Sequence, residues 1–328
     1  MFKFKKRKNK DISISKTPVK VTEVNFNKAD LLFRVQIGNI LRNGFLDENP
    51  RPKYQDGTPA HTYSVNQNWH TYDLNQGEFP ITTLRRMYWK SAIKEILWIM
   101  QDQTSDLSVL RDKYNIKVWD QWESKDVPNT IGYRYGETIR RYDLVNKLIK
   151  ELKEDPFGRR HIIDLYQYAD FQATDGLYPC AFMTMWNVRK GDPIIDLNNP
   201  LKEDKDTLYL DMTLIQRSGD CLVASHPGGW NEIQYAALLM MVAQVCGYKP
   251  GVFGHFIQNE QIYDRHIEQA KDLIKRQSII EDNKMPMLKL NPDIKDFYDF
   301  TIDDFEMINY PTKDIDEKNP QLSFDMGI

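Results

Sequence analysis

The chain has 328 residues, enough for one large domain or two ordinary ones. Its formal net charge of -3 gives no general attraction to nucleic acid or to an anionic membrane, and its three cysteines are too few for a disulfide framework. No long apolar stretch follows the basic start of the sequence, so we expect no secretory signal peptide, and no run of about eighteen apolar residues occurs. Because cysteine-poor chains without disulfides are typical of reducing compartments, we expect a cytoplasmic protein.

The predicted elements follow a basic N-terminal run. Residues 1–26 are expected to form a disordered tail and residues 27–328 a single domain. Hydrophobic periodicity and turn residues predict, in chain order, a helix at 30–43, a loop at 47–57, a strand at 62–74, a helix at 83–101, strands at 161–168, 181–188 and 207–216, a polar connection at 198–206, and helices at 231–246 and 263–276. Strands and helices alternate without a regular β-α-β rhythm, which is typical of the α+β class.

The stretch GLYPCAFMTMW places Cys180 directly after a proline, at the start of a predicted strand. Cysteine reacts as the thiolate, which neighbouring positive charge favours. Taken alone, Cys180 fits a buried packing residue as well as a nucleophile. Cys246 lies within an apolar helix and is expected to pack. The six histidines show no metal-ligand spacing, so no metal site is predicted.

Arginines gather near predicted strand ends. Arg159 and Arg160 precede one strand, Arg217 and Ser218 follow another, and Arg51 lies in a proline-flanked loop. Guanidinium groups bind phosphate in a bidentate manner, and a hydroxyl can complete the shell. Each arginine alone also fits a solvated surface, but the set indicates an anion site.

Four further residues have two interpretations each. Asn231 fits a helix N-cap or an amide that reads a nucleobase. Glu95 lies off the apolar stripe of its helix, so it fits a solvated residue or a proton shuttle. Trp119 and Trp122 fit core packing or the wall of a site for a flat heterocycle.

A series of short stretches, in order and at compatible spacing, resembles the folate-dependent thymidylate synthase family from about residue 27 to residue 328. These stretches are DGTPAHTYSV, KEILWIM, VWDQW, GYRYG, RRHI, PC, QRSGD, WNEIQYAALLMMVAQVCGY, IYDRHIEQ and DFYDFTIDDF. The resemblance implies an α+β fold in which a mixed β-sheet packs with helices and stacks on its counterpart across a homodimer. It also implies the conversion of dUMP and 5,10-methylenetetrahydrofolate to dTMP and dihydrofolate, with the folate as co-substrate and no metal.

The resemblance further implies roles for individual residues. The catalytic set comprises the nucleophile Cys180, the proton-relay residue Glu95, the uracil reader Asn231 and Tyr135 of the solvent network. The residues implied in binding dUMP are Arg51, Gln216, Arg217, Ser218, Gln261 and Tyr263, with Arg159 and Arg160 reaching the phosphate of the neighbouring subunit. The residues implied in binding folate are Arg85, Trp119, Trp122, Leu177, Asp220 and the terminal Ile328.

The chain also departs from the family pattern. The segment between Asp220 and Asn231 is longer than is usual, and Gln261 stands where a histidine is usual. These departures leave open a pyrimidine-nucleotide hydroxymethylase, which would trap the transferred carbon with water, and a nucleotide- or RNA-binding regulator without catalysis. Asn231 favours uracil over cytosine, and Trp122 argues against the reaction with water.

Overall fold

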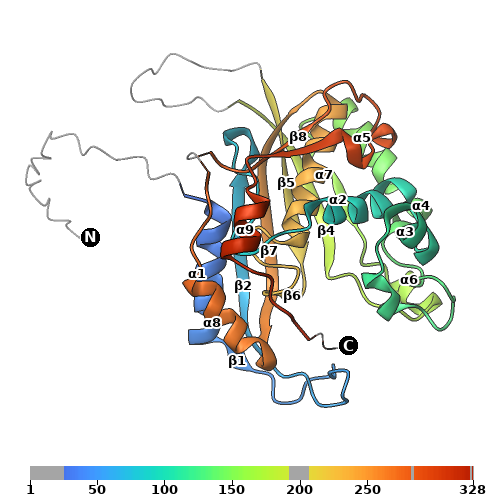
Figure 1. Cartoon of the computed structure of the whole chain (residues 1–328). Coiled ribbons are helices and arrows are strands. Elements are labelled where there is room, and N and C mark those ends of the chain that lie inside the picture. The colour runs from blue at the N-terminus through green and yellow to red at the C-terminus, as the bar shows by residue number, and fades with distance from the viewer. Residues whose placement is uncertain (1–25, 192–206, 282–283, 326, 328) are drawn as a thin grey trace, which may run out of the picture.

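A mixed β-sheet forms the centre of the protein (Figure 1). The structure is a computed structural model that describes residues 26–191, 207–281, 284–325 and 327. The strands of the main sheet are β1 (Phe45–Leu46), β2 (Thr62–Asp73), β3 (Ile162–Asp164), β4 (Ala181–Lys190), β5 (Leu208–Gln216), β6 (Gly219–Asp220) and β7 (Lys249–Tyr263). They lie in the order β1-β2-β7-β5-β4-β3, with β6 paired to β7. Since β5 and β7 are parallel and the pairs β2–β7 and β4–β5 are antiparallel, the predicted α+β class with a mixed sheet is confirmed.

The helices are α1 (Lys28–Asn43), α2 (Trp89–Leu97), α3 (Leu107–Tyr114), α4 (Gly136–Tyr142), α5 (Leu144–Glu154), α6 (Tyr168–Ala173), α7 (Trp230–Cys246), α8 (Ile267–Lys275) and α9 (Thr312–Lys318). Helices α1, α7 and α8, among others, pack against the main sheet. A separate two-stranded sheet pairs β8 (Met287–Leu290) with β9 (Phe305–Ile308). Among the described residues, no helix combines the length and apolar composition that crossing a membrane requires.

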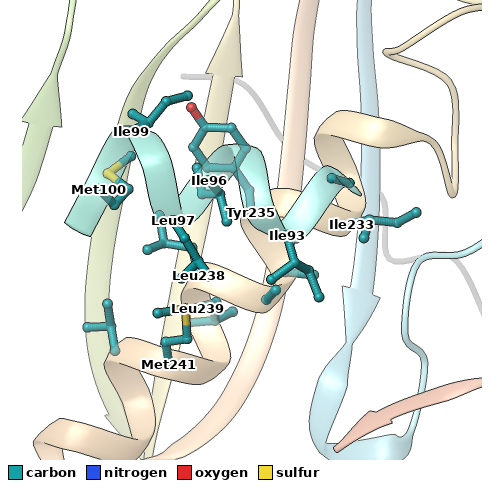
Figure 2. Close-up of a cluster of buried hydrophobic side chains, with 14 of the residues drawn as sticks. Ile93, Ile96, Leu97, Ile99, Met100, Ile233, Tyr235, Leu238, Leu239 and Met241 are labelled. Carbon is teal, nitrogen blue, oxygen red and sulfur yellow. The ribbon is translucent and has the colours of Figure 1, made fainter. Parts of the chain in front are cut away.

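Helix α7 is the centre of the main hydrophobic core. It packs against β5 and β7 on one side and against α2 on the other. Figure 2 shows Ile93 and Leu97 of α2 beside Leu238 and Leu239 of α7, and all four are buried. The nearly uniform apolar composition of this helix predicted its burial, which the structure confirms. The packing fixes the first turn of α7 relative to the end of β5.

The predicted helix at 83–101 is wrong over its first six residues, because α2 begins only at Trp89. The segment before it is held by side chains from elsewhere. Asp30 of α1 accepts hydrogen bonds from the Thr82 hydroxyl at 2.5 Å and from the Thr83 amide at 2.7 Å. These tertiary hydrogen bonds outweigh the local helical pattern. A π-helical turn at Trp98–Asp102 then continues from α2.

Strand β7 is absent from the predicted elements, and the helix predicted at 263–276 begins only at Ile267. The sequence conceals β7 because two of its buried positions carry polar side chains, His255 and Glu260. The strand predicted at 161–168 is shorter than expected, at Ile162–Asp164. The remaining predicted helices and strands are confirmed, with ends that differ by one or two residues.

Parts of the prediction lie outside the described residues. They include most of the expected tail, the polar connection at 198–206 and Ile328. The division into a tail and a single domain therefore stays a prediction.

Replacing Leu238 with alanine is expected to lower the free energy of unfolding by about 2–5 kcal/mol, because the cavity left between α2 and α7 cannot refill. Chemical denaturation at one fixed protein concentration measures this loss. Lys150→Ala on the exposed side of α5 is the control and should change stability by less than about 0.5 kcal/mol. Equal effects of the two substitutions would contradict the assignment of this core.

Candidate active site

A cavity of about 1240 Å³ lies beside the ends of β4, β5 and β7 and the start of α7. Its lining includes these predicted site residues: Arg51, Arg85, Glu95, Trp119, Trp122, Tyr135, Leu177, Cys180, Gln216, Arg217, Ser218, Asp220, Asn231, Gln261 and Tyr263. Arg159 and Arg160 are exposed between α5 and β3 and do not line it. Residues far apart in the sequence thus converge on one space that is large enough for two small-molecule ligands.

Cys180 is held at the edge of the cavity by the start of β4 and the end of β5. The Arg217 amide donates to the Cys180 carbonyl at 2.9 Å, and the guanidinium of Arg217 donates to the carbonyls of Pro179 at 3.0 Å and Tyr178 at 2.7 Å. The guanidinium nitrogen that binds Tyr178, Nη2 of Arg217, also lies 3.5 Å from the Cys180 sulfur. The arginine therefore fixes the loop and places positive charge beside the thiol.

Two opposing effects act on the Cys180 thiol. Burial raises its pKa above the ordinary value, and the positive charge of Arg217 opposes that rise. A thiolate at this position therefore depends on Arg217 as its stabilising charge. The Cys180 amide also donates to the Tyr135 hydroxyl at 3.3 Å, which ties the thiol loop to the opposite wall of the cavity.

The start of α7 supplies two side-chain amides, those of Asn231 and Gln234. Gly229 is the N-cap of α7, so the interpretation of Asn231 as the cap is wrong. Its side-chain oxygen instead accepts from the Ser225 hydroxyl at 3.2 Å and from the Gln216 amide at 3.4 Å. Its side-chain nitrogen donates to Gln234 at 3.2 Å. Asn231 thus presents a donor and an acceptor beside the cavity, as one edge of a nucleobase requires.

Glu95 is buried on α2 and faces the start of α7. The side-chain amide of Gln234 donates to its carboxylate at 2.7 Å. Burial raises the pKa of Glu95, and hydrogen bonds from Trp119, Gln234 and Trp230 oppose the rise. A carboxyl group with a raised pKa can hold and release a proton near neutral pH, so the interpretation as a solvated helix residue is wrong.

Aromatic rings form one wall of the cavity. The rings of Trp119 and Trp122 lie 5.5 Å apart, and Trp119 contacts Tyr135 edge-on at 5.3 Å. Leu177 lines the same cavity. Such a wall suits a flat heterocycle and keeps water from it.

Asp220 and Arg85 lie on the side of the cavity formed by the long segment after β6. One carboxylate oxygen of Asp220 is buried without a hydrogen-bond partner among the described residues, and burial raises the pKa of Asp220 to about 6. Arg85 is buried, where it donates to the Val223 carbonyl at 2.8 Å and to His226 at 3.0 Å. The unpaired oxygen of Asp220 is the kind of acceptor that an N–H-bearing ring would satisfy.

The segment between Asp220 and Asn231 turns sharply at Gly228, which has φ = +69°. A side-chain carbon there would lie 2.5 Å from the Thr82 amide nitrogen, so glycine is required by both the backbone conformation and the space. The extra length in this segment is therefore folded back against the protein, and it delivers Ser225 to Asn231.

Comparisons with known proteins agree with this arrangement. A family model described as thymidylate synthase matches residues 32–320. The chain belongs to the thymidylate synthase family. It is 47% identical to the thymidylate synthase of Streptococcus pneumoniae (strain 70585) over 302 residues, which cover 92% of this chain and 99% of that protein. It is 48% identical to the thymidylate synthase of Lactococcus lactis subsp. cremoris (strain SK11) over the same coverage.

A solved structure gives the same result for the thymidylate synthase fold. The thermostable thymidylate synthase A from Bacillus subtilis superimposes with a TM-score of 0.76 at 33% identity and covers 92% of this chain and 99% of that one. The family membership and fold expected from the resemblance are confirmed.

Several residues of this thymidylate synthase site were not predicted. Gln234 lies three positions after Asn231, so helical spacing could have placed both on one face of α7. Ser225, Glu232 and His255 gave no such signal. Ser225 lies in the irregular segment before α7, and His255 lies in the strand that the sequence concealed.

Replacing Arg217 with glutamine is expected to raise the pKa of Cys180 further, since the neighbouring positive charge that opposes the effect of burial is lost. The pH dependence of alkylation of Cys180 by iodoacetamide, followed by peptide mass spectrometry, measures the shift. Lys150→Gln removes the same charge from the exposed side of α5 and should leave the profile unchanged. Profiles that coincide for Arg217→Gln and the wild type would refute the electrostatic role.

Proposed function

We propose that Cys180 is the nucleophile with which this chain carries out the thymidylate synthase reaction. The reaction converts dUMP to dTMP, with 5,10-methylenetetrahydrofolate as co-substrate. The observation that carries the assignment is the position of the Cys180 sulfur, 3.5 Å from Arg217 on a cavity that Asn231 and Glu95 also line.

The nucleotide phosphate is assigned to the arginine side of the cavity. Arg217 and Ser218 follow directly after β5, and Arg51 lines the same space. Guanidinium and hydroxyl groups are strong phosphate donors. Gln261 and Tyr263 lie two residues apart on β7, so their side chains share one face, where they would hold the ribose. Gln261 accepts from the Ser218 hydroxyl at 3.5 Å, which links the two groups.

The pyrimidine is assigned to Asn231, with its C6 atom beside Cys180. The thiolate adds to C6, and the new carbon–sulfur bond moves negative charge toward O4 and C5. The amide of Asn231 stabilises that charge with a hydrogen bond, and C5 becomes the nucleophile. Glu95, whose pKa is raised by burial, accepts through the site's hydrogen bonds the proton that leaves C5, and the Cys180 sulfur leaves C6 as the thiolate when dTMP is released.

The folate is assigned to the aromatic side. Trp119, Trp122 and Leu177 offer a flat apolar wall, and the unpaired oxygen of Asp220 fits a donor on the pterin ring. Arg85 would meet the negatively charged tail of the folate. Bound methylenetetrahydrofolate supplies the one-carbon unit and then the hydride that completes the methyl group. Ile328, which lies outside the described residues, is assigned to closing the site.

The reported relatives are thymidylate synthases by name, so they give no support to a hydroxymethylase or to a regulator without catalysis. The aromatic wall beside Cys180 supports the same conclusion, because excluding water protects the transferred carbon from hydration.

We propose that the chain acts as a homodimer in the cytoplasm. Trp69 lies on the face of the sheet opposite to buried His70. Its side chain is 51% exposed and contacts the ring of Phe256. A large apolar side chain on an open sheet face supports its burial against a second copy. Arg159 and Arg160, exposed away from their own cavity, would then reach the partner's phosphate site. The three free cysteines are consistent with a reducing compartment.

Incubation of the chain with dUMP and 5,10-methylenetetrahydrofolate is expected to yield dTMP and dihydrofolate in equal amounts, as measured by mass spectrometry. The Cys180→Ser variant should lose turnover by at least about a thousandfold, because a hydroxyl is a far weaker nucleophile than a thiolate, and should keep most of its dUMP affinity. Hydroxymethyl-dUMP as product would refute the methylation, and wild-type turnover by the variant would refute the nucleophile.

Mixed dimers test the role of the paired arginines. One subunit carries Cys180→Ser, and the other carries Arg159→Ala with Arg160→Ala. If the arginines act in the partner's site, each hybrid dimer regains one intact site, and random mixing of equal amounts restores about a quarter of wild-type activity. Subunit exchange is first demonstrated independently. If the exchanged mixture then shows no recovery of activity, Arg159 and Arg160 act in their own subunit.

A further inference from the structure

A buried cluster of ionisable side chains lies beneath the cavity floor without lining the cavity. His70 of β2, Glu232 of α7 and His255 of β7 are all buried. One oxygen of Glu232 lies 3.1 Å from Nδ1 of His70 and 3.2 Å from Nδ1 of His255, and its other oxygen accepts from the Gly228 amide at 2.6 Å. A buried ionised side chain needs hydrogen-bond or ion-pair partners, and these three residues and the Gly228 amide provide them for one another.

The orientation of the Gln216 amide can be deduced from its neighbours. Its nitrogen lies 2.9 Å from the Ser218 carbonyl, which can only accept a hydrogen bond, so that end is the NH₂ group. The amide oxygen therefore faces His255, whose Nε2 lies 3.0 Å away. Because this oxygen can only accept, Nε2 of His255 must carry a hydrogen.

The other nitrogen of the same ring is fixed as well. Nδ1 of His255 faces the carboxylate of Glu232, so a proton must lie between them, or two lone pairs would meet. Burial by itself would raise the pKa of Glu232. The hydrogen bonds from His255 and His70 outweigh this effect and lower the pKa of Glu232 to about 2. Burial lowers the pKa of His255 despite the opposing Glu232 carboxylate, so the positions of the ring protons are assigned from the two hydrogen-bond contacts, with the proton at Nδ1 shared with Glu232. The ring therefore cannot turn over without losing both hydrogen bonds.

The polarity set by this ring continues to Asn231. The Gln216 amide donates to the Ser225 hydroxyl at 2.7 Å, and Ser225 donates to the side-chain oxygen of Asn231 at 3.2 Å. On the other side, the Asn231 nitrogen donates to Gln234, which in turn donates to Glu95. Asn231 lies between these two chains of hydrogen bonds, and each chain places its side-chain oxygen toward Ser225 and its side-chain nitrogen toward Gln234.

That orientation decides which base the site reads. The N3–H of uracil is a donor and its O4 is an acceptor, whereas N3 of cytosine is an acceptor and its amino group is a donor. An asparagine amide matches uracil in one orientation and cytosine when turned over. An asparagine at position 231 is therefore not enough to distinguish uracil from cytosine. The donors and acceptors around its amide decide between the two bases.

We propose that His255, held by Glu232, is a positioning residue that fixes the Gln216 amide and through it the Asn231 amide in the orientation that reads uracil. The long segment before α7 takes part, since it contributes the Ser225 hydroxyl and the Gly228 amide that binds Glu232. This inference rests on the proposed function of the site, in which Asn231 reads the base.

A matched pair of variants separates positioning from packing. In His255→Asn the amide nitrogen takes the place of Nδ1, so the contact with Glu232 is kept and the contact with Gln216 is lost. His255→Gln reaches the place of Nε2 and restores a donor to Gln216. His70→Asn is the control, because it makes the same change in the same cluster at a ring that contacts Glu232 and not Gln216.

The readout is the ratio of dissociation constants for dUMP and dCMP, measured by titration calorimetry on folded dimers. His255→Asn is expected to weaken dUMP binding about tenfold, as the loss of one buried hydrogen bond predicts. The preference of the site for dUMP over dCMP should fall by a similar factor. His255→Gln should stay within about threefold of the wild type, and His70→Asn should leave the ratio unchanged.

The outcomes separate this inference from the proposed function. An unchanged ratio in His255→Asn, or an equal narrowing in His70→Asn, would overturn the positioning role while dUMP binding by the wild type remains. A wild-type chain that binds neither nucleotide would overturn the proposed function and this inference with it.

The wild-type chain offers a second test that needs no variant. In ¹⁵N spectra of histidine-labelled protein, Nε2 of His255 should be protonated at neutral pH. An unprotonated Nε2 would overturn the assignment. A stoichiometric divalent metal in the purified protein would also overturn it, because the three ligand atoms lie within 4.8 Å of one another and a metal would replace the shared proton.

Discussion

Glu232 and Gln234, in the first turn of α7, are buried, so each must find a hydrogen-bond partner inside the protein. Their partners come from β7 and α2, which the hydrophobic core holds against the rest of α7. The apolar body of the helix thus fixes the height and rotation of its polar end. The geometry of the site follows from this constraint, because Asn231 lies in the same turn.

The thiol side is built on a different principle. Arg217 uses most of its guanidinium to tie down the backbone before Cys180, and the same group lowers the cost of forming a thiolate. One residue therefore couples loop shape to reactivity. The two halves of the site meet at the end of β5, where Gln216 points toward α7 and the next residue points toward the thiol.

Much of this could be predicted from the sequence, and particular residues show where the prediction stopped. Cys180 and Arg217 stand in short motifs whose types already indicate their chemistry, and the apolar run of α7 is unmistakable. The start of α2 was misplaced because Asp30, distant in sequence, binds Thr82 and Thr83 and keeps them out of the helix. Strand β7 was concealed because two of its buried positions carry the polar residues His255 and Glu260 in place of aliphatic residues.

The sequence by itself determined the chemical types at the site and the α+β class, since hydrophobic periodicity and motif spacing are local properties of the chain. Tertiary structure alone decided which of those residues share a cavity and which way each amide faces. Orientation of an amide depends on donors and acceptors brought together from β5, β7 and α7, and no spacing along one segment encodes that meeting. For the same reason Asn231, which suits a helix cap on local grounds, lies two residues after the N-cap Gly229 and lines the cavity.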